Sequence, residues 1–499
     1  MSKYEQFFIE IAKSLDLNDT EIETITRSYN AVGEFLAESS VLKPYSPKVF
    51  PQGSMRLGTV VKPLSRDDYD IDLVCELQNG TGLSPKQVKQ FVGYVLQNSK
   101  YKSQLEEEHG RCWTLDYSAN PPYHLDILPG IEITGGRVKA TIKRNNIYDW
   151  LFTNPKGFAN WFLSLYSRRR LQEDNKNVES VKIFDNKTPL QRAVQLIKRH
   201  RDVYYRENPD DGPASIIITT LSGLSYNDET SIENILRNGP IQWLSHISYK
   251  NGKYSIKVPS LPDDDYADKW NGEYKGAAKR FFEWHRRLLL DLDELFRQRS
   301  INDFLKVAKR LFADSTIDKL SKSNVRLIDS LRESFDKENH LPVKVDDIHP
   351  LFIHAQSIYK TYPYMYRSGV SISLSAKVFN NERDALNNSN DISALKFDDY
   401  SLLIPKERWI RFYAYVINPS HINTYVLFQV TNTGEEAKKE KENQMRGDFY
   451  PPENNMKYTR IEHTMFRGTH FVQAFLIERG SKADYCIAKS EILTVNIGE

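Results

Sequence analysis

The first forty residues carry apolar side chains at the spacing of two amphipathic helices. The apolar positions are Phe7, Phe8, Ile11, Ala12 and Leu15, then Ile22, Ile25, Tyr29, Val32, Phe35 and Leu36. Intervals of three and four residues place such positions on one face of a helix. Asn18 or Asp19 can cap the second helix, because short polar side chains accept hydrogen bonds from the first N–H groups. The pattern predicts two helices within residues 3–40.

The next hundred residues change to an alternating pattern. Residues 57–77 are extended, with a polar turn at 65–68, and DIDLVCEL (70–77) is typical of a strand. SPKQVKQFVGYVLQN (84–98) predicts a helix, since a serine cap precedes a proline at the first helical position. RCWTLDYS, YHLDILPGIEI and RVKATIKR predict further strands. Together these elements indicate a small α/β sheet domain.

Two further regions follow, and they differ in character. Residues 154 to about 333 are mostly helical, in the stretches GFANWFLSLYSRRRLQ, TPLQRAVQLIKRHRDVYYR, PASIIITTLSGLSY and ADKWNGEYKGAAKRFFEWHRRLLLDLDELFRQ. After about residue 341, strands rich in β-branched and aromatic residues predict an all-β domain of the sandwich type. We therefore expect an α+β chain with a sheet domain and N-terminal helices at 1–153, a helical lobe at 154–335 and a β-rich domain at 336–499.

Composition and charge exclude several classes of protein. The chain has 499 residues, of which 40% are hydrophobic and 27% charged, so it can form large cores. Its net charge of +2 gives no general argument for a DNA- or RNA-binding protein. The three cysteines lie far apart and form no CxxC motif, which favours a reduced, cytoplasmic protein. We expect no signal peptide and no membrane span.

The sharpest chemical signal is a group of acids in the first predicted strand. Residues i and i+2 of a strand face the same side, so Asp70 and Asp72 point together. Two adjacent carboxylates repel each other unless both are solvated or a cation lies between them. Mg²⁺ prefers oxygen ligands, and a two-metal site with ions about 4 Å apart needs another carboxylate, which Asp126 can supply from a neighbouring strand. The alternative is a solvated hairpin. Asp67 and Asp68 are interpreted as turn residues only.

A Gly-Ser pair precedes the acids. Gly53 lets a backbone approach a phosphate closely, and Ser54 offers a hydroxyl as well as an N–H. Arg56 can contact phosphate or pair with an acid of the polar turn. Gly-Ser is also a very common loop dipeptide, and short motifs give many false positives. In this order, with a later strand-borne aspartate, the motifs predict metal-dependent nucleotidyl transfer.

These motifs resemble a known family. QGS followed by DID and HLDI resembles the polymerase-β-like nucleotidyltransferases, and TPLQRAVQLIKRHRD with PASIIITTL is similar to the cGAS/DncV-like group (CD-NTases, the SMODS group). The resemblance implies synthesis of a cyclic di- or trinucleotide from NTPs, ATP among them, in bacterial antiphage (CBASS) signalling through a downstream effector. It implies catalytic, metal-binding roles for Asp70, Asp72 and Asp126, with two Mg²⁺ ions or Mn²⁺ instead.

The resemblance also assigns nucleotide-binding residues. It implies that Gly53 and Ser54 hold the donor triphosphate, and that Lys198 and Ser215 reach it from the helical lobe. Lys198 lies at the edge of an apolar helix face, where a lysine serves as a point charge for phosphates. Its alternative is a solvated basic face. Ser215 follows Pro213 near a helix start, so it is alternatively a helix residue without a ligand.

The C-terminal segment, about 342–497, resembles the adenylyl/guanylyl cyclase and SMODS C-terminal sensor domain. The resemblance implies a sensing or regulatory role and an unknown ligand. Asn432 to Gly434 and Arg467 to His470 are candidate loop residues at strand ends, where sandwiches often bind ligands. Turn chemistry and a structural histidine are the alternatives there.

Two other functions remain open at this point. An RNA- or tRNA-end nucleotidyltransferase shares the acids and the Gly-Ser turn, but it needs an extended basic surface that the net charge does not indicate. A catalytically inactive ligand-sensing scaffold is the third possibility, and the presence of all three acids argues against it.

Overall fold

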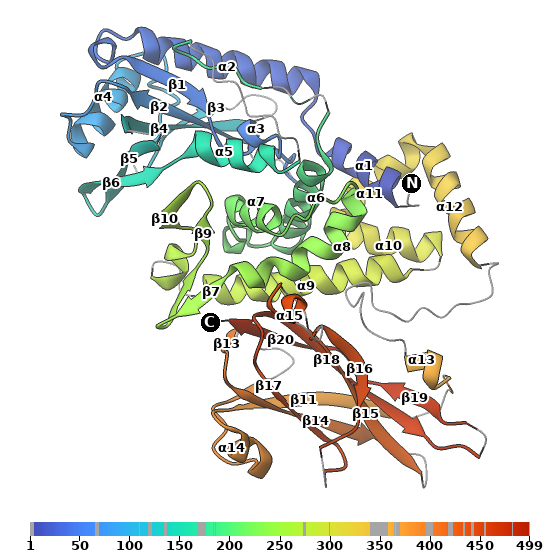
Figure 1. The fold of residues 1–499 in the computed structure, drawn as a ribbon. Helices are drawn as coiled ribbons and strands as arrows, with labels where there is room; N and C mark the ends of the chain where they lie inside the picture. Colours follow the sequence, from blue (N-terminus) through green and yellow to red (C-terminus); the bar gives the residue numbers. More distant parts are fainter. Residues whose placement is uncertain are drawn as a thin grey trace.

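The protein has three regions that follow one another along the chain (Figure 1). The computed structural model describes residues 4–64, 69–108, 110–117, 122–133, 137–166, 176–182, 184, 186–272, 276–298, 300–339, 358–363, 365, 370–395, 403–417, 423–432, 435–440, 444–453, 456–481 and 483–498. A sheet with flanking helices lies at one end, a helical lobe lies in the middle, and a β-rich domain lies at the other end. No helix in these ranges is both long and apolar enough to cross a bilayer.

The first region is a mixed sheet. Its strands are β1 (Pro47–Pro51), β2 (Tyr69–Leu77), β3 (Trp113–Tyr117), β4 (Tyr123–Ile133), β5 (Arg137–Arg144) and β6 (Ile147–Thr153). Their order is β1-β2-β4-β5-β6, with β3 also paired to β4. Strands β2 and β4 run parallel, and the other pairs are antiparallel. Two helices have N-caps at the predicted positions: Asn18 caps α2 (Asp19–Glu38) and Ser84 caps α4 (Pro85–Gln97), each with a full capping box.

The alternation of side chains along β2 and β4 decides which face of the sheet carries the aspartates. Leu73 and Cys75 of β2, and Leu125 and Ile127 of β4, are buried in one core with α2 and α4. Successive side chains of a strand point to opposite faces. The aspartates that alternate with these core residues therefore lie on the face away from α2 and α4, toward the helical lobe.

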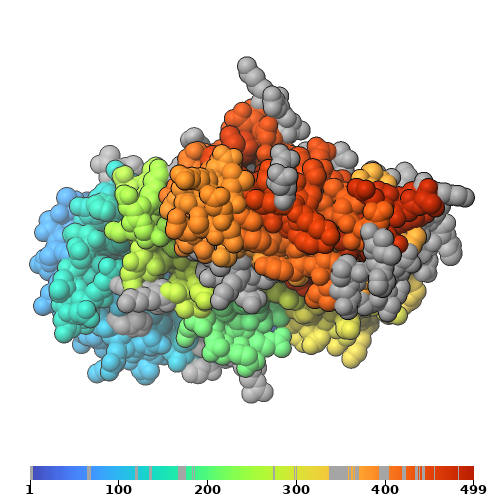
Figure 2. Space-filling model, turned by 90° about the horizontal axis from the view of Figure 1, so that it is seen from below, coloured from blue at the N-terminus to red at the C-terminus, as the bar shows by residue number. Residues whose placement is uncertain are grey.

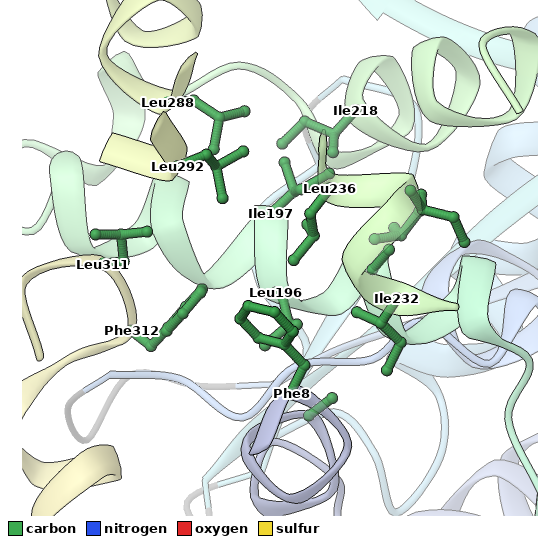
Figure 3. Close-up of a cluster of buried hydrophobic side chains, with 14 of the residues drawn as sticks. Phe8, Leu196, Ile197, Ile218, Ile232, Leu236, Leu288, Leu292, Leu311 and Phe312 are labelled. Carbon is green, nitrogen blue, oxygen red and sulfur yellow. The ribbon is translucent and has the colours of Figure 1, made fainter. Parts of the chain in front are cut away.

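The middle region is a helical lobe built around α6. Its helices are α1 (Glu5–Ser14), α5 (Pro155–Ser164), α6 (Pro189–Tyr204), α7 (Ser215–Leu224), α8 (Ile232–Gln242), α9 (Ala277–Arg297), α10 (Ile301–Phe312), α11 (Asp314–Ser323) and α12 (Val325–Asn339), with short 3₁₀ turns η2 (Pro209–Asp211) and η3 (Trp243–His246). Phe8 of α1 is directed toward Leu196 of α6 in this core (Figure 3). The first helix of the chain thus completes the lobe rather than the sheet.

One helix prediction in the lobe was wrong in extent. The stretch from residue 267 was expected to be a single long helix, but α9 begins only at Ala277, after Gly276 with φ of +87°. A 3₁₀ turn, η4 (Asp268–Asn271), precedes it. Four short strands were missed: β7 (Ser248–Lys250), β8 (Lys253–Ser255), β9 (Lys257–Val258) and β10 (Leu261–Asp265). Two glycines in the stretch favour turns over a continuous helix.

The C-terminal region is a two-sheet sandwich, as predicted. One sheet has the order β12-β11-β14-β17, and the other β13-β20-β18-β15-β16 with β19 paired to β18. The strands are β11 (Ser371–Phe379), β12 (Ser393–Leu395), β13 (Leu403–Pro405), β14 (Trp409–Ile417), β15 (Thr424–Thr431), β16 (Arg446–Tyr450), β17 (Thr459–His463), β18 (Gly468–Glu478), β19 (Tyr485–Lys489) and β20 (Leu493–Gly498). Alternate residues of both sheets form a single apolar core.

The sandwich touches the helical lobe through a small apolar contact. Phe471 of β18 and Ile492 pack against Ile241 of α8 and Leu289 of α9. Strand β18 also contacts η3 of the lobe. In the view from below, the orange and red C-terminal domain lies across the yellow-green lobe (Figure 2). The two regions therefore share one buried apolar contact.

Candidate active site

The three predicted acids line one cavity between the sheet and the helical lobe. Asp72 on β2 is in register with Asp126 on the parallel strand β4, and Asp70 lies two residues earlier on the same face of β2. Neighbouring strands lie about 4.8 Å apart, so Asp72 and Asp126 are adjacent. The cavity has a volume of about 400 Å³, and Gly53 and Ser54 also line it. The structure thus brings the acids and the Gly-Ser pair together.

Gly53 is fitted against Asp72. It opens a five-residue helix, α3 (Gly53–Leu57), with φ of +61°. A Cβ atom at this position would lie 2.0 Å from Oδ2 of Asp72. The N–H of Gln52 donates to the carbonyl oxygen of Asp72 at 2.9 Å, which holds the two segments together. Both the backbone conformation and the close approach therefore require glycine.

Asp126 is oriented by a residue that was not predicted. The hydroxyl of Thr114 donates to Oδ1 of Asp126 at 2.6 Å, and the two residues are direct partners in the β3–β4 ladder. Charge-assisted hydrogen bonds of this kind are short and strong. The only available signal in the sequence was the alternation of the strand WTLDY, which places Thr114 and Asp116 on one face.

The acids influence one another electrostatically. Burial, followed by the charges of Asp126 and Asp70, raises the pKa of the Asp72 carboxyl to about 7, and Lys198 opposes this rise. In the described part of the chain, no three His, Cys, Asp or Glu side chains are already gathered as an ion-binding cluster. The donor set nevertheless fits a hard divalent cation, because three carboxylates face one cavity and a cation would relieve their repulsion.

Lys198 and Ser215 face the acids from the lobe, and both have partners within the protein. The buried ammonium of Lys198 donates to the carbonyl oxygen of Thr59 at 3.1 Å and to its hydroxyl at 3.0 Å. Burial and the charge of Arg201 lower the pKa of Lys198 to about 7. Ser215 begins α7, and its hydroxyl accepts from Arg201 at 2.8 Å. Arg201 is a further unpredicted residue of this wall.

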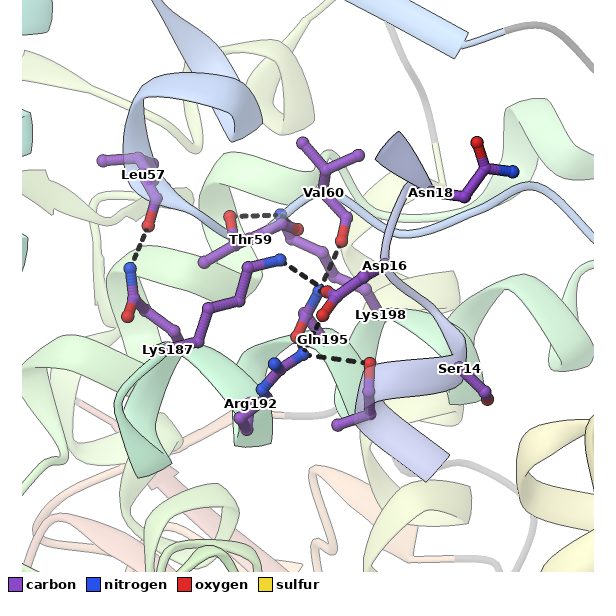
Figure 4. Close-up of polar contacts among 12 residues, drawn as sticks. Ser14, Asp16, Asn18, Leu57, Thr59, Val60, Lys187, Arg192, Gln195 and Lys198 are labelled. Atoms are coloured by element: carbon purple, nitrogen blue, oxygen red, sulfur yellow. Dashed lines mark hydrogen bonds and ion pairs between the residues drawn. The ribbon is translucent and has the colours of Figure 1, made fainter. Parts of the chain in front are cut away.

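Helix α6 also holds the segment that follows the Gly-Ser pair (Figure 4). Side chains of α6 donate to successive carbonyl oxygens of this segment: Gln191 to Leu57 at 2.8 Å, Gln195 to Val60 at 2.6 Å and Arg199 to Lys62 at 2.5 Å. Asp16, between α1 and α2, accepts hydrogen bonds from Arg192 and Gln195 of α6 and from Lys187 just before it. The segment that follows α3, the short helix that carries Ser54, is thereby fixed to the lobe.

A second, larger cavity adjoins the first. Its volume is about 820 Å³, and it shares Ser54, Asp70, Lys198 and Ser215 with the smaller cavity. Its charged lining residues are Asp70, Lys198, Arg201, Asp202, Arg206, Glu207, Asp210 and Asp314. Of the three site acids, Asp70 lines both cavities, and Asp72 and Asp126 line the smaller one.

Three other sequence interpretations have different outcomes. Asp67 and Asp68 lie outside the described residues. Arg56 is buried, pairs with Glu179 at 3.0 Å and is among the residues that line the smaller cavity. In the sandwich, His470 is buried, with its two ring nitrogens within 3.0 Å of Asn432 Oδ1 and 2.7 Å of the Phe466 carbonyl oxygen. Burial lowers the pKa of His470 to about 4, as expected of a structural histidine.

Two parts of the chain match models of known protein families. Residues 1–165 match the model of the Second Messenger Oligonucleotide or Dinucleotide Synthetase (SMODS) domain, and residues 354–498 match the Adenylyl/Guanylyl and SMODS C-terminal sensor (AGS_C) domain. The chain is 26% identical over 343 residues, 66% of its length and 90% of the relative's, to a c-di-GMP synthase of Roseivirga ehrenbergii.

A second relative is similar to this chain both in sequence and in fold. The chain is 24% identical over 275 residues to the cyclic dinucleotide synthase CdnG of Bradyrhizobium diazoefficiens, covering 48% of this chain and 64% of that one. The structure of that CD-NTase in complex with GTP is similar in fold, with a TM-score of 0.52 at 20% identity, over 63% of this chain and 96% of the other.

Proposed function

We propose that this chain, which belongs to the SMODS group of nucleotidyltransferases and carries an AGS_C domain, joins two nucleoside triphosphates into a cyclic dinucleotide. The observation that carries the proposal is the pair of cavities that meet at Asp70 and share Ser54. A ring-forming enzyme must hold two nucleotides at once, with the α-phosphate of one beside the ribose hydroxyl of the other. Two adjoining cavities with Asp70 at their junction suit that requirement.

In the proposed reaction, the oxygen of a ribose hydroxyl of one nucleotide forms a bond to the α-phosphorus of the other, and the hydroxyl proton passes to water. The bond between that phosphorus and pyrophosphate breaks, and pyrophosphate leaves with the electron pair. A second round between the remaining triphosphate and the free ribose hydroxyl closes the ring. Ser54 binds the donor phosphates beside Asp72, and Lys198 supplies positive charge from α6 once it exchanges Thr59 for phosphate.

Mg²⁺ is the proposed cofactor, held by Asp70, Asp72 and Asp126, with two ions expected and Mn²⁺ as an alternative. When bound, such ions stabilise the charge that develops on the attacking and leaving oxygens. The chain's own contribution is orientation: Thr114 holds Asp126, and the Gly53 contact fixes Asp72. Burial and the charges of Asp126 and Asp70 raise the pKa of Asp72, and a bound cation would oppose that rise by favouring the ionised form.

An RNA-end nucleotidyltransferase is the competing enzyme class. Its substrate would need a basic path for the phosphate backbone. The charged residues that line the larger cavity include more acidic than basic side chains, five against three, which disfavours an RNA backbone there. Added RNA should therefore not be extended.

We also propose that the C-terminal domain regulates synthesis in response to a bound ligand, and that the product activates an effector in bacterial antiphage (CBASS) signalling. Support comes from the AGS_C match and from the contact of Phe471 with the lobe. Challenging bacteria with phage in the presence of the wild-type or the Asp72→Asn enzyme tests this role. Equal survival of both strains, with product forming in the wild type, would contradict it.

The test of the enzymatic proposal uses labelled NTPs and Mg²⁺, followed by phosphatase treatment and mass spectrometry. We expect a phosphatase-resistant small product from the wild type and none from Asp72→Asn. Asp116→Asn is the matched control, because Asp116 is exposed on neighbouring strand β3 and lines neither cavity. Extension of added RNA, or incorporation that survives in Asp72→Asn, contradicts the proposal. If no nucleotide is joined under any condition, the inactive scaffold becomes the better explanation.

A further inference from the structure

The cavity with the acids continues to a wall formed by the β9–β10 hairpin of the lobe. Val258, Asp264 and Tyr266 line this wall. Phe158 of α5 and Arg111 of the sheet domain complete it. The hairpin stands beside α7 and below β6 in Figure 1, and β10 contacts β6. The wall therefore spans the junction of the sheet domain and the lobe, at the side of the cavity that the larger space does not share.

Asp265 fixes the direction of its two neighbours. Its carboxylate accepts from the N–H groups of Ile256 at 2.7 Å and Ala267 at 2.9 Å, and it also accepts from the hydroxyl of Ser255. These contacts hold Asp265 toward the interior of the lobe. Asp264 precedes Asp265 in the extended backbone of β10 and therefore points the other way. Tyr266 follows in a turn, and both Asp264 and Tyr266 line the cavity.

The wall combines an aromatic surface with the carboxylate of Asp264, which accepts a hydrogen bond at one of its two oxygens. The rings of Phe158 and Tyr266 meet edge to face, with centroids 6.3 Å apart. Oδ1 of Asp264 accepts from the N–H of Asp265 at 2.9 Å, and no group in the described part of the chain donates to Oδ2. Burial raises the pKa of Asp264, and the positive charge of Arg111 opposes that rise. A carboxylate accepts at both oxygens, so this one has capacity for a ligand.

We propose that this wall selects a guanine base, with Asp264 as the specificity-determining residue. Guanine presents two adjacent donors, N1–H and the 2-amino group, which a carboxylate accepts together. Adenine presents the N1 lone pair at the same place, and two acceptors repel each other. Tyr266 offers an aromatic surface for the base, since proteins read an unstacked base by stacking and by hydrogen bonds to its Watson–Crick edge. Arg111 is placed to donate to O6.

This inference rests on the proposed function, because it assumes that the cavity takes a nucleotide. It narrows the substrate from any NTP to GTP for at least one of the two positions. It agrees with the description of one relative as a c-di-GMP synthase and with the GTP complex of the structural neighbour.

The inference is tested without turnover by measuring, with calorimetry, how tightly non-hydrolysable GTP and ATP analogues bind in the presence of Mg²⁺. We expect the wild type to bind the GTP analogue at least about tenfold more tightly than the ATP analogue, as expected of a bidentate base contact. Asp264→Asn should reduce or reverse this preference, since a carboxamide can donate to adenine N1. Asp264→Ser should lose the preference without reversing it.

Asp263→Asn is the matched control, because Asp263 is exposed, adjacent in sequence and absent from the cavity lining. The Asp263→Asn variant should prefer the GTP analogue over the ATP analogue to the same extent as the wild type. An unchanged GTP preference in both Asp264 variants, or a wild type that does not prefer GTP, overturns the inference.

The failures of the two proposals differ. If a cyclic product forms and its base composition is the same in wild type and Asp264→Asn, base selection by Asp264 is wrong and the proposed function stands. If the variants change base preference in binding but no nucleotides are joined, base selection stands and the proposed function is wrong.

Discussion

Gly53 and Asp72 approach each other so closely that a single methyl group at residue 53 would lie 2.0 Å from the Asp72 carboxylate. The Gly-Ser pair and the first pair of acids are therefore one structural unit, although 18 residues separate Gly53 from Asp72 in the sequence. A substitution at Gly53 must therefore displace Asp72, and a displacement of Asp72 must affect Gly53.

Gly53→Ala should reduce nucleotide incorporation by about a hundredfold, because a displacement near 1 Å at a reacting centre has that effect. The positive φ of Gly53 adds backbone strain of about 1–2 kcal/mol for alanine. The rate of product formation is measured together with the melting temperature. Gly82→Ala is the control, since a Cβ there meets nothing within 4 Å. Equal activity of the two variants would show that the contact has no role.

Thr114→Val tests the support of Asp126. The change keeps the shape of the side chain and removes the hydroxyl that donates to Oδ1 at 2.6 Å. We expect Mg²⁺ affinity or activity to fall about 10–100-fold, as for other residues that orient a metal ligand. Thr141→Val is the matched control, because Thr141 is buried in the same sheet and its hydroxyl has no partner in the described structure. Measuring the rate of product formation at increasing Mg²⁺ concentrations distinguishes the two variants.

Lys198 predicts a pH dependence of nucleotide binding. Its pKa of about 7 lies below the ordinary value, so it is mostly neutral at pH 8 and mostly charged at pH 6. A triphosphate favours the charged form, so affinity should increase as the pH falls from 8 to 6. The titration is made without divalent metal and compared with Lys198→Gln, which keeps the contribution of Asp72.

The difference between wild type and Lys198→Gln should be largest at pH 6 and smallest at pH 8. Lys306→Gln, an exposed change on α10, should behave as the wild type. A pH profile that is the same in wild type and Lys198→Gln would show that Lys198 does not bind the triphosphate and only holds Thr59.

Phe471→Ala tests regulation by the C-terminal domain. It removes most of the apolar contact that β18 makes with Ile241 and Leu289. Coupling between two sites typically amounts to 1–3 kcal/mol, so the basal rate of synthesis should change by at least about fivefold. Tyr415→Ala is the control, because Tyr415 is 55% exposed on β14 of the other sheet. Hydrogen exchange of α8 should change in the first variant alone, and unchanged rates in both would contradict the regulatory role.

Much of the site could be predicted because its signals are local. Strand alternation places Asp70 and Asp72 on one face, whichever elements pack around it, and the same rule places Asp126 outward from Leu125 and Ile127. The Asn18 and Ser84 caps and the alternating strands of the sandwich follow from equally short-range preferences. The extent of α9 could not be predicted, because its apolar period continues through glycines that the fold uses as turns.

The acids, the Gly-Ser pair, the order of the three regions and the resemblance to a family could thus be identified from local patterns. The residues that surround them could be identified only in the folded molecule. Thr114 reaches Asp126 through a strand pairing, α6 holds the carbonyl groups of residues 57–62 from more than 130 residues away, and Asp264 enters the cavity on a hairpin that no pattern indicated. Such partners are chosen by packing between distant segments, and packing leaves no period in the sequence that a reader could detect.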